Sequence, residues 1–438
     1  MKARLVPLYF VNSRDPDFDL QLSRLKQLLS DQAEFLDPLP LGGELPEAEA
    51  VIFPQFLGEA YHTVDHFREI QLPILVITSE FGTVLMWDWE IVSYLRSEGV
   101  KTIAPSSLEQ TQKILNALQL KRSTHSANFL VYQDNPGEGF QSEIFKRFYW
   151  FEDECIQRMQ DKFGLTILKK SFKDLASKAK LISDGEAEEI IQERQFAVEG
   201  LAPGAVRSAA KVYLAVRDEI RSMNGIGAVG INCLNESRYS DTTPCLAWNL
   251  LYEEEQMIWG CEADIVSMLT KYILHKTLHM PIMMTNLYPF LMGKAALAHE
   301  RIPYFPAVDE PENHILAAHC GYLGVVPQTF ATQWRLSPKV LAIVDENASA
   351  IDARLPLGDM TLAKFDSSLE VMSVAEGSLT EYVQYEDSDC LNGAILRVAD
   401  GRRMLDRITS HHYLLMTGHH QADIEMIGKV FNFQIAEL

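Results

Sequence analysis

The chain has 438 residues, of which 47% are hydrophobic and 23% charged, and its formal net charge is −21 at pH 7. This length exceeds one ordinary core, so we expect two or three domains. The negative charge disfavours nucleic acid and anionic membranes as partners, because both need a basic protein surface. No apolar run approaches the ~20 residues that span a bilayer.

The N-terminus and the cysteines indicate a reducing compartment. The first residues, MKARLVPLYFVNSRDPD, lack the apolar region and cleavage site of a signal peptide. The six cysteines are scattered and form no CxxC pair, which favours buried free thiols over a zinc ribbon. We therefore expect a cytoplasmic protein.

Residues 1–125 alternate strand and helix signals. The runs AVIFP (50–54) and ILVIT (74–78) are short and continuously apolar, as buried parallel strands are. Residues 19–29 and 87–95 have the apolar spacing of helices. This βαβ pattern predicts an N-terminal Rossmann-like α/β domain.

Residues 126–305 repeat the α/β pattern and predict a second, central Rossmann-like domain. The expected strands are FLVYQ after Asn128, TILKKSF, 227–233, QMIWG and MPIMMT (280–285). The expected helices cover 142–163, 184–194, 206–222 and 264–275. The two domains together form a tandem.

From residue 306 to residue 438 the pattern becomes mostly β. Short strands are expected at 314–318, 340–344, 360–365, 369–374 and 394–398, and a final helix at 422–431. Pro, Gly, Asp and Asn turns separate many of these strands. Such spacing favours a small β-barrel or a sandwich as the C-terminal domain.

The segment Gly225–Gly230 spells GxGxxG, the dinucleotide-binding fingerprint. That fingerprint follows a strand and opens a helix, so that a pyrophosphate meets the helix N-terminus. Here it follows a predicted helix and enters a predicted strand, the reverse context. We interpret it as a helix stop that leads into a strand.

Glu262 is the first candidate for chemistry. It follows the strand QMIWG and precedes a helix, so it lies at the carboxyl edge of the predicted sheet, where open α/β folds bind ligands. Its flanks are apolar, and a buried carboxylate needs a cation or a metal. The alternative is that Glu262 and Asp264 only stabilise the first turn of the next helix through its dipole.

Histidines are the second signal. His319 lies in the apolar run ILAAHCGYLG, and the pair His411–His412 opens another apolar strand. Imidazole together with carboxylate suits a divalent transition metal such as Mn, Fe, Co or Zn. A lone histidine in an apolar strand is more often structural, and the sequence alone does not bring these residues together.

Four motifs in order resemble one known family. They are the run INCLNESRYSDTTPCLAWNLLYEEEQMIWGCEADI, the strand AAHCG, the phrase LGDMTLAKF, and the ending HHYLLMTGHH with ADIEMIGKVFNFQI. Together they resemble the L-fucose/L-arabinose isomerase-like superfamily, in particular its fucose-isomerase-like branch. The resemblance covers residues 225–438 well and the first 200 residues only in overall pattern.

The resemblance implies a metal-dependent aldose–ketose isomerase that acts through an enediolate. In such enzymes a divalent metal, commonly Mn, is held by a Glu, a second carboxylate and a histidine from the β domain. By this resemblance Glu262 is expected to be a metal ligand and the base, and His319 and His412 are expected to be histidine ligands. His411 competes with His412 as the ligand and is otherwise a substrate-binding residue.

The second carboxylate is where the chain departs from the family. It is expected near Asn286, yet no Asp or Glu occurs between Asp264 and Glu300. Asn286 can offer a neutral oxygen to a metal, but it cannot act as a base. Glu236, Asp241 or Glu300 can substitute in principle; otherwise the reaction differs, or the protein is a catalytically silent carbohydrate-binding or regulatory homologue.

The resemblance also bears on aromatic residues and assembly. Such isomerases are homo-oligomers, trimers or hexamers, and often borrow an aromatic residue from a neighbouring subunit to pack on the sugar. Trp87 is the candidate for that substrate-binding role, with Trp89 and Trp248 behind it. Core packing is the competing interpretation for each.

Overall fold

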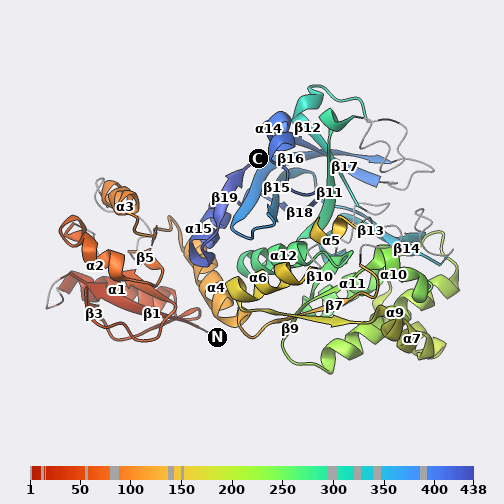
Figure 1. The fold of residues 1–438 in the computed structure, drawn as a ribbon, viewed down its shortest axis with the longest axis horizontal. Coiled ribbons are helices and arrows are strands. Elements are labelled where there is room, and N and C mark those ends of the chain that lie inside the picture. Colours follow the sequence, from red (N-terminus) through yellow and green to blue (C-terminus); the bar gives the residue numbers. More distant parts are fainter. Residues whose placement is uncertain are drawn as a thin grey trace. The chain divides into compact units, whose positions relative to one another are not determined.

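The structure is a computed structural model in which two compact units are distinguished (Figure 1). The first comprises residues 1–125, 276–278 and 422–434, and the second the remaining residues from 126 to 438. The structure describes residues 2–10, 14, 16–54, 58–78, 88–136, 143–148, 152–293, 304, 306–319, 327–338, 347–384 and 392–438. None of the helices among these residues combines the length and apolar character needed to cross a membrane.

The first unit contains a parallel sheet, as the βαβ pattern predicts. Its strands run in the order β2-β1-β4-β5-β6, with β3 beside β1. The strands are β1 (Ala3–Tyr9), β2 (Ala33–Phe35), β3 (Leu39–Pro40), β4 (Ala50–Phe53), β5 (Ile74–Val76) and β6 (Thr102–Ile103). The helices are α1 (Pro16–Leu28), α2 (Val64–Glu69), α3 (Asp88–Ser97), α4 (Leu108–Thr124) and α15 (Gln421–Phe431).

The second unit contains a four-stranded parallel sheet in the order β10-β9-β7-β8. Its strands are β7 (Asn128–Tyr132), β8 (Thr166–Lys170), β9 (Ile226–Ile231) and β10 (Ile258–Cys261). The helices are α5 (Phe145–Phe148), α6 (Asp153–Phe163), α7 (Phe172–Leu181), α8 (Asp184–Arg194), α9 (Pro203–Arg221), α10 (Cys233–Glu236), α11 (Cys245–Glu255) and α12 (Ile265–Leu278). The single helix predicted over 142–163 is wrong, because Glu152 is extended and α6 begins anew after it.

A closed six-stranded barrel follows in the C-terminal region, so the barrel prediction is confirmed. Its strands run β15-β18-β11-β12-β17-β16, and β16 pairs back with β15. They are β11 (Met283–Pro289), β12 (His314–Ala318), β15 (Gly358–Phe365), β16 (Val371–Gln384), β17 (Asn392–Val398) and β18 (His412–Thr417). The flanking elements are the hairpin β13 (Gln333–Pro338) and β14 (Ser349–Arg354), helix α14 (Gly401–Arg407) and strand β19 (Gln434–Glu437).

One predicted strand belongs to a different sheet from the one expected. The segment MPIMMT was assigned to the central parallel sheet, but β11 pairs antiparallel with β12 and β18 in the barrel. The apolar run fits either place, because barrel strands covered on both faces also lack polar alternation. The strand predicted at 340–344 lies outside the described residues.

Glycines let the parallel sheet and α12 approach closely. A side chain on Gly260 of β10 would come within 2.2 Å of Met268 Cγ on α12. Gly225, which has a φ of +69°, turns the chain from α9 into β9. The GxGxxG segment is therefore a helix stop and a strand, as interpreted from the sequence.

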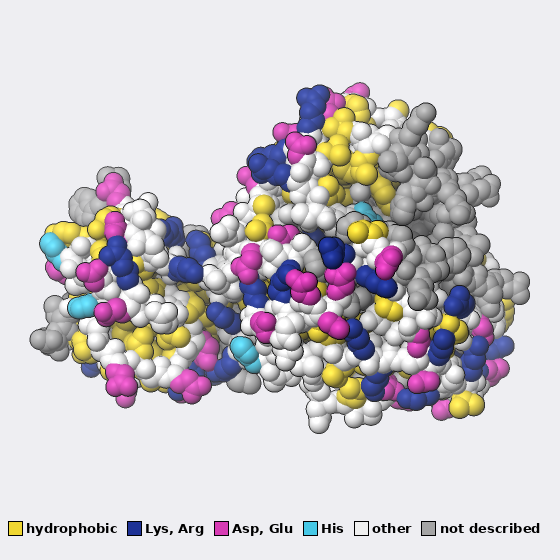
Figure 2. All heavy atoms as spheres, in the orientation of Figure 1, with side chains coloured by type: hydrophobic (Ala, Val, Ile, Leu, Met, Phe, Trp, Pro, Cys, Tyr) yellow, Lys and Arg dark blue, Asp and Glu magenta, His cyan; other side chains and the backbone are white. Residues whose placement is uncertain are grey.

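Helix α12 lies between the parallel sheet and the barrel of the second unit (Figure 1). Its N-terminal turn carries Asp264 and Ser267 toward Lys364 of barrel strand β15. On the face shown in Figure 2, the acidic and basic side chains of the described residues are interspersed. The candidate functional site lies where α12 begins.

Candidate metal centre

Three residues predicted as metal ligands lie together in the second unit. One ligand atom from each of Glu262, His319 and His412 falls within 4.8 Å of the others, and all three side chains are buried. His412 Nε2 and Glu262 Oε1 lie 3.7 Å apart. This group could hold a metal ion.

The register of the barrel explains why the two histidines meet. On β11, Asn286 pairs with His412 of β18 on one side and with Ala318 of β12 on the other. His319 directly follows Ala318, so both histidines flank the same position of β11. Their ring centroids are 5.5 Å apart.

Glu262 reaches the group through an unusual backbone. Glu262 and Ala263 both have a φ of +54°, the left-handed region that residues other than glycine rarely adopt. The two residues link the end of β10 to α12 and turn the Glu262 carboxylate out of the strand direction. Backbone strain of this kind clusters at functional sites.

Asp264 orients His412. Its carboxylate Oδ2 lies 3.0 Å from His412 Nδ1 and accepts a hydrogen bond from it, which leaves Nε2 as the nitrogen that faces Glu262. A carboxylate behind a metal-binding imidazole is the usual arrangement in metalloproteins. Asp264 also accepts from the backbone N–H of Ser267, as the N-cap of α12. The dipole interpretation of Asp264 is therefore correct in part.

Lys364 compensates the buried charge of Asp264. Lys364 Nζ lies 2.8 Å from Asp264 Oδ2, with side chains 1% and 0% exposed, and it also donates to Ser267 Oγ. Burial alone would raise the pKa of Asp264, but Lys364 and His412 outweigh it and hold that pKa below its usual range. Burial lowers the pKa of Lys364, and Asp264 offsets only part of that shift. The geometry is that of an ion pair.

Asn286 orients the other histidine. Its Oδ1 lies 3.2 Å from His319 Nδ1, while its Nδ2 donates to the Tyr288 hydroxyl at 2.9 Å. With Nδ1 donating to the amide oxygen, His319 keeps Nε2 for a metal. Asn286 thus contacts His319 of the candidate group, and its own use as a metal ligand stays a prediction.

The remaining predicted site residues are outside the group of Glu262, His319 and His412. His411 is half-buried and its ring centroid is 4.3 Å from that of His412, but His412 and not His411 belongs to the described group that could hold an ion. Substrate contact by His411 stays a prediction. Trp87 lies outside the described residues. Trp248 is fully buried in α11, which confirms core packing for it.

The donor set fits a divalent transition metal. Two imidazoles and one carboxylate form the set used for Zn, Mn and Fe sites with open coordination positions. Two ligands bonded to one such ion at about 2.0–2.2 Å each lie at most about 4.4 Å apart, which matches the pair at 3.7 Å. The metal's identity does not follow from the donors.

Metal binding is expected to weaken as the pH falls. Burial alone would lower the pKa of His412, but the carboxylates of Asp264 and Glu262 outweigh it, so that pKa is raised. A proton and a metal compete for Nε2, so competition begins above the usual imidazole value of about 6.5. We expect the Mn²⁺ affinity, measured by calorimetry from pH 8 to pH 6, to fall by about tenfold per unit below the His412 pKa.

The control for this pH series is His125→Gln, which changes an exposed imidazole of the first unit. It should show the same profile as the wild type. An affinity that is constant between pH 8 and pH 6 would contradict ligation by His412.

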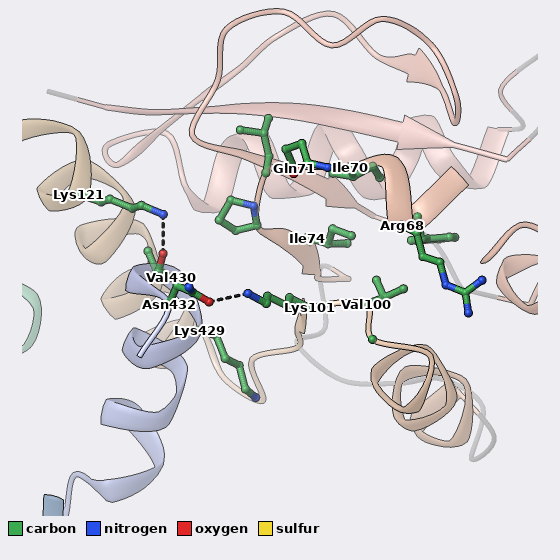
Figure 3. Close-up of a pocket in the computed structure, with 14 residues that line it drawn as sticks. Arg68, Ile70, Gln71, Ile74, Val100, Lys101, Lys121, Lys429, Val430 and Asn432 are labelled. Carbon is green, nitrogen blue, oxygen red and sulfur yellow. Dashed lines mark hydrogen bonds between the residues drawn. The ribbon is translucent and has the colours of Figure 1, made fainter. Parts of the chain in front are cut away.

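A hollow of about 340 Å³ in the first unit is unrelated to this group (Figure 3). Its cations include Lys101 and Lys121, which donate to the Asn432 side chain and to the Val430 carbonyl at the end of α15. Cations stabilise the carbonyl-rich end of a helix. These lysines therefore have a structural role.

Comparison of the chain with protein-family models finds no match. Comparison with curated proteins likewise finds no match.

Proposed function

We propose that the chain is a metal-dependent aldose–ketose isomerase-like protein of the fucose-isomerase-like type. The observation that carries the proposal is the buried group of Glu262, His319 and His412 beside the carboxyl edge of a parallel sheet. The four ordered motifs of the sequence add to it. The tandem Rossmann-like arrangement, manganese as the metal and a homo-oligomer belong to the same proposal.

The residues of the group have distinct roles in this proposal. When bound, a divalent ion would polarise the carbonyl and the adjacent hydroxyl of an open-chain sugar. His319 and His412 would hold the ion, each oriented through Nδ1 by Asn286 or Asp264. Glu262 would hold it as well, and its second oxygen would lie within reach of a proton on the sugar.

The second acid–base group is the open part of the proposal. Asp264 is tied to Lys364, Ser267 and the Nδ1 side of His412, so it does not face the ligand atoms.

The three substitutes named from the sequence differ in their surroundings. Asp241 pairs with Lys180 at 3.0 Å and is half exposed. Glu300 lies outside the described residues. Of the two described residues, only Glu236 is fully buried, so it is the remaining candidate.

The second candidate function is a catalytically silent carbohydrate-binding or regulatory homologue. It is favoured by Asn286, which occupies the expected place of the second carboxylate and is engaged with His319 and Tyr288. In this alternative the metal group binds a sugar without moving its protons.

An activity screen separates the two. Wild type and Asn286→Asp, both loaded with Mn²⁺, are incubated with aldoses and ketoses, and interconversion is followed by chromatography. We expect wild type to interconvert at least one pair, and removal of Mn²⁺ by a chelator to abolish this. If only Asn286→Asp is active, the silent homologue is supported; if neither is active but both bind a sugar, isomerisation is contradicted.

A further inference from the structure

Three residues leave adjacent strands of the parallel sheet at the same level. Tyr132 of β7 aligns with Ile231 of β9, and Ile231 aligns with Cys261 of β10. The next residues are Gln133, Asn232 and Glu262. Neighbouring strands lie about 4.8 Å apart, so Asn232 and Glu262 are neighbouring residues at the carboxyl edge of the sheet.

The chain after β9 stays close to the chain after β10. Cys233 Sγ and Cys261 Sγ are 3.4 Å apart and buried. Asn232 donates its backbone N–H to Tyr132 O at 3.0 Å, which fixes it between the two neighbouring strand ends. The side chains of 232–237 therefore lie at the same sheet edge as the proposed metal.

Polar atoms without hydrogen-bond partners gather at this edge. Asn232, Glu236 and Ser237 are each 0% exposed. Within the described part of the chain, no hydrogen-bond partner is present for either amide atom of Asn232, for Glu236 Oε2 or for Ser237 Oγ. Gln133 Oε1, on the adjoining strand end, is in the same situation.

The second oxygen of Glu236 has a structural task. Glu236 Oε1 accepts from the backbone N–H groups of Asp134 and Asn135, at 3.0 and 2.8 Å. This fixes the carboxyl group through Oε1, while Oε2 has no hydrogen-bond partner among the described residues. Burial raises the pKa of Glu236, although the two backbone N–H groups act in the opposite direction.

The chemistry of these atoms matches hydroxyl groups. An amide, a hydroxyl and a carboxyl group together both donate and accept hydrogen bonds, as the hydroxyls of a sugar or polyol do. Buried polar groups are normally paired, and an apolar occupant would leave every one of these atoms unsatisfied.

We propose that Asn232 and Glu236 bind hydroxyl groups of the polyhydroxylated ligand whose carbonyl end is held at Glu262. This inference rests on the proposed function, because it uses the same ligand. It names the residues that select an open-chain polyol over an apolar or a shorter molecule. Ser237 and Gln133 contribute further polar atoms at the same edge of the sheet.

The test uses polyols, which cannot be isomerised and so report binding alone. L-arabitol and galactitol are titrated by calorimetry into the full-length protein, with and without Mn²⁺. We compare wild type with Asn232→Leu and Glu236→Gln. Each variant is expected to bind the polyol at least about tenfold more weakly, because one buried hydrogen-bonding partner is lost.

The two variants are chosen to keep the fold. Leucine has nearly the shape of asparagine, and replacing an unpaired buried amide by it should leave the thermal midpoint equal or higher. Glutamine keeps a carbonyl oxygen for the N–H groups of Asp134 and Asn135. Tyr132→Phe is the matched control, since its buried hydroxyl lacks a partner in the described chain but lies toward Glu219 of α9. It should not change polyol affinity.

The outcomes separate this inference from the proposed function. Equal polyol affinity in wild type and both variants, or no polyol binding by a Mn²⁺-loaded wild type, overturns the inference and leaves the metal site standing. Polyol binding that depends on Asn232 and Glu236 in a protein that takes up no metal supports the inference and contradicts the isomerase.

Discussion

Glu262→Gln is expected to release the metal that wild type holds. After growth with excess manganese, wild type should carry about one divalent ion per chain, and the variant almost none. Glu262 supplies the negative charge of the described ligand group and is 5% exposed, and the nearby Asp264 carboxylate is already paired with Lys364 and with the Nδ1 side of His412. Substitution of a residue that only orients a metal ligand lowers metal affinity by about 10–100-fold. Because Glu262 is itself a proposed ligand, its loss should lower the affinity for Mn²⁺ by more than about 100-fold.

Metal content is measured by mass spectrometry of the purified proteins, and affinity by calorimetry. Glu47→Gln is the control, because the Glu47 side chain is 94% exposed in the first unit, and it should keep the wild-type metal content. Asp264→Asn should lie between the two, because it keeps the three ligands and changes the orientation of His412, although it also removes the carboxylate partner of Lys364. A metal-free wild type, or a fully loaded Glu262→Gln protein, contradicts the metal site.

Lys364→Met is expected to lower the free energy of unfolding strongly. It leaves the Asp264 carboxylate buried without its cation, in a position that is 0% exposed. Removing one partner of a buried ion pair costs about 3–5 kcal/mol, because the desolvated charge that remains is uncompensated. The free energy of unfolding should fall by that amount in the transition of the second unit.

Urea unfolding followed by tryptophan fluorescence measures this effect, because Trp248 and Trp259 are buried in the second unit. The matched control is Lys180→Met, whose partner Asp241 forms an ion pair with both side chains about half exposed. Exposed pairs contribute about 0–1 kcal/mol, so this control should stay near wild type. Similar losses in both variants would contradict the role of Lys364.

The sequence predicted the candidate ligands but not how they are oriented. Glu262 was identifiable because it follows a strand and precedes a helix, and His319 and His412 because an imidazole is unusual in an apolar strand. What supports them was missed. Lys364 occurs within the apolar, buried run LAKF, and a lysine in such a strand is a signal of a buried carboxylate partner.

The fold was predictable where local pattern decides it. The continuous apolar runs of β4 and β5, and the strand–turn spacing of the C-terminal region, correspond to a parallel sheet and to a barrel. The assignment of β11 failed because pairing is a long-range property. An apolar run of this length suits a parallel sheet and a barrel equally, and the partners of β11 follow it at 314–318 and 412–417.

The place of β11 in the barrel has a consequence for how the site comes into being. Its two neighbours bring His319 and His412 from distant parts of the chain, while Glu262 directly follows β10 of the parallel sheet. The three ligands therefore come together only when the barrel and the parallel sheet are both formed. An ion bound there would favour only the completely assembled unit, and would shift the folding equilibrium toward it by mass action.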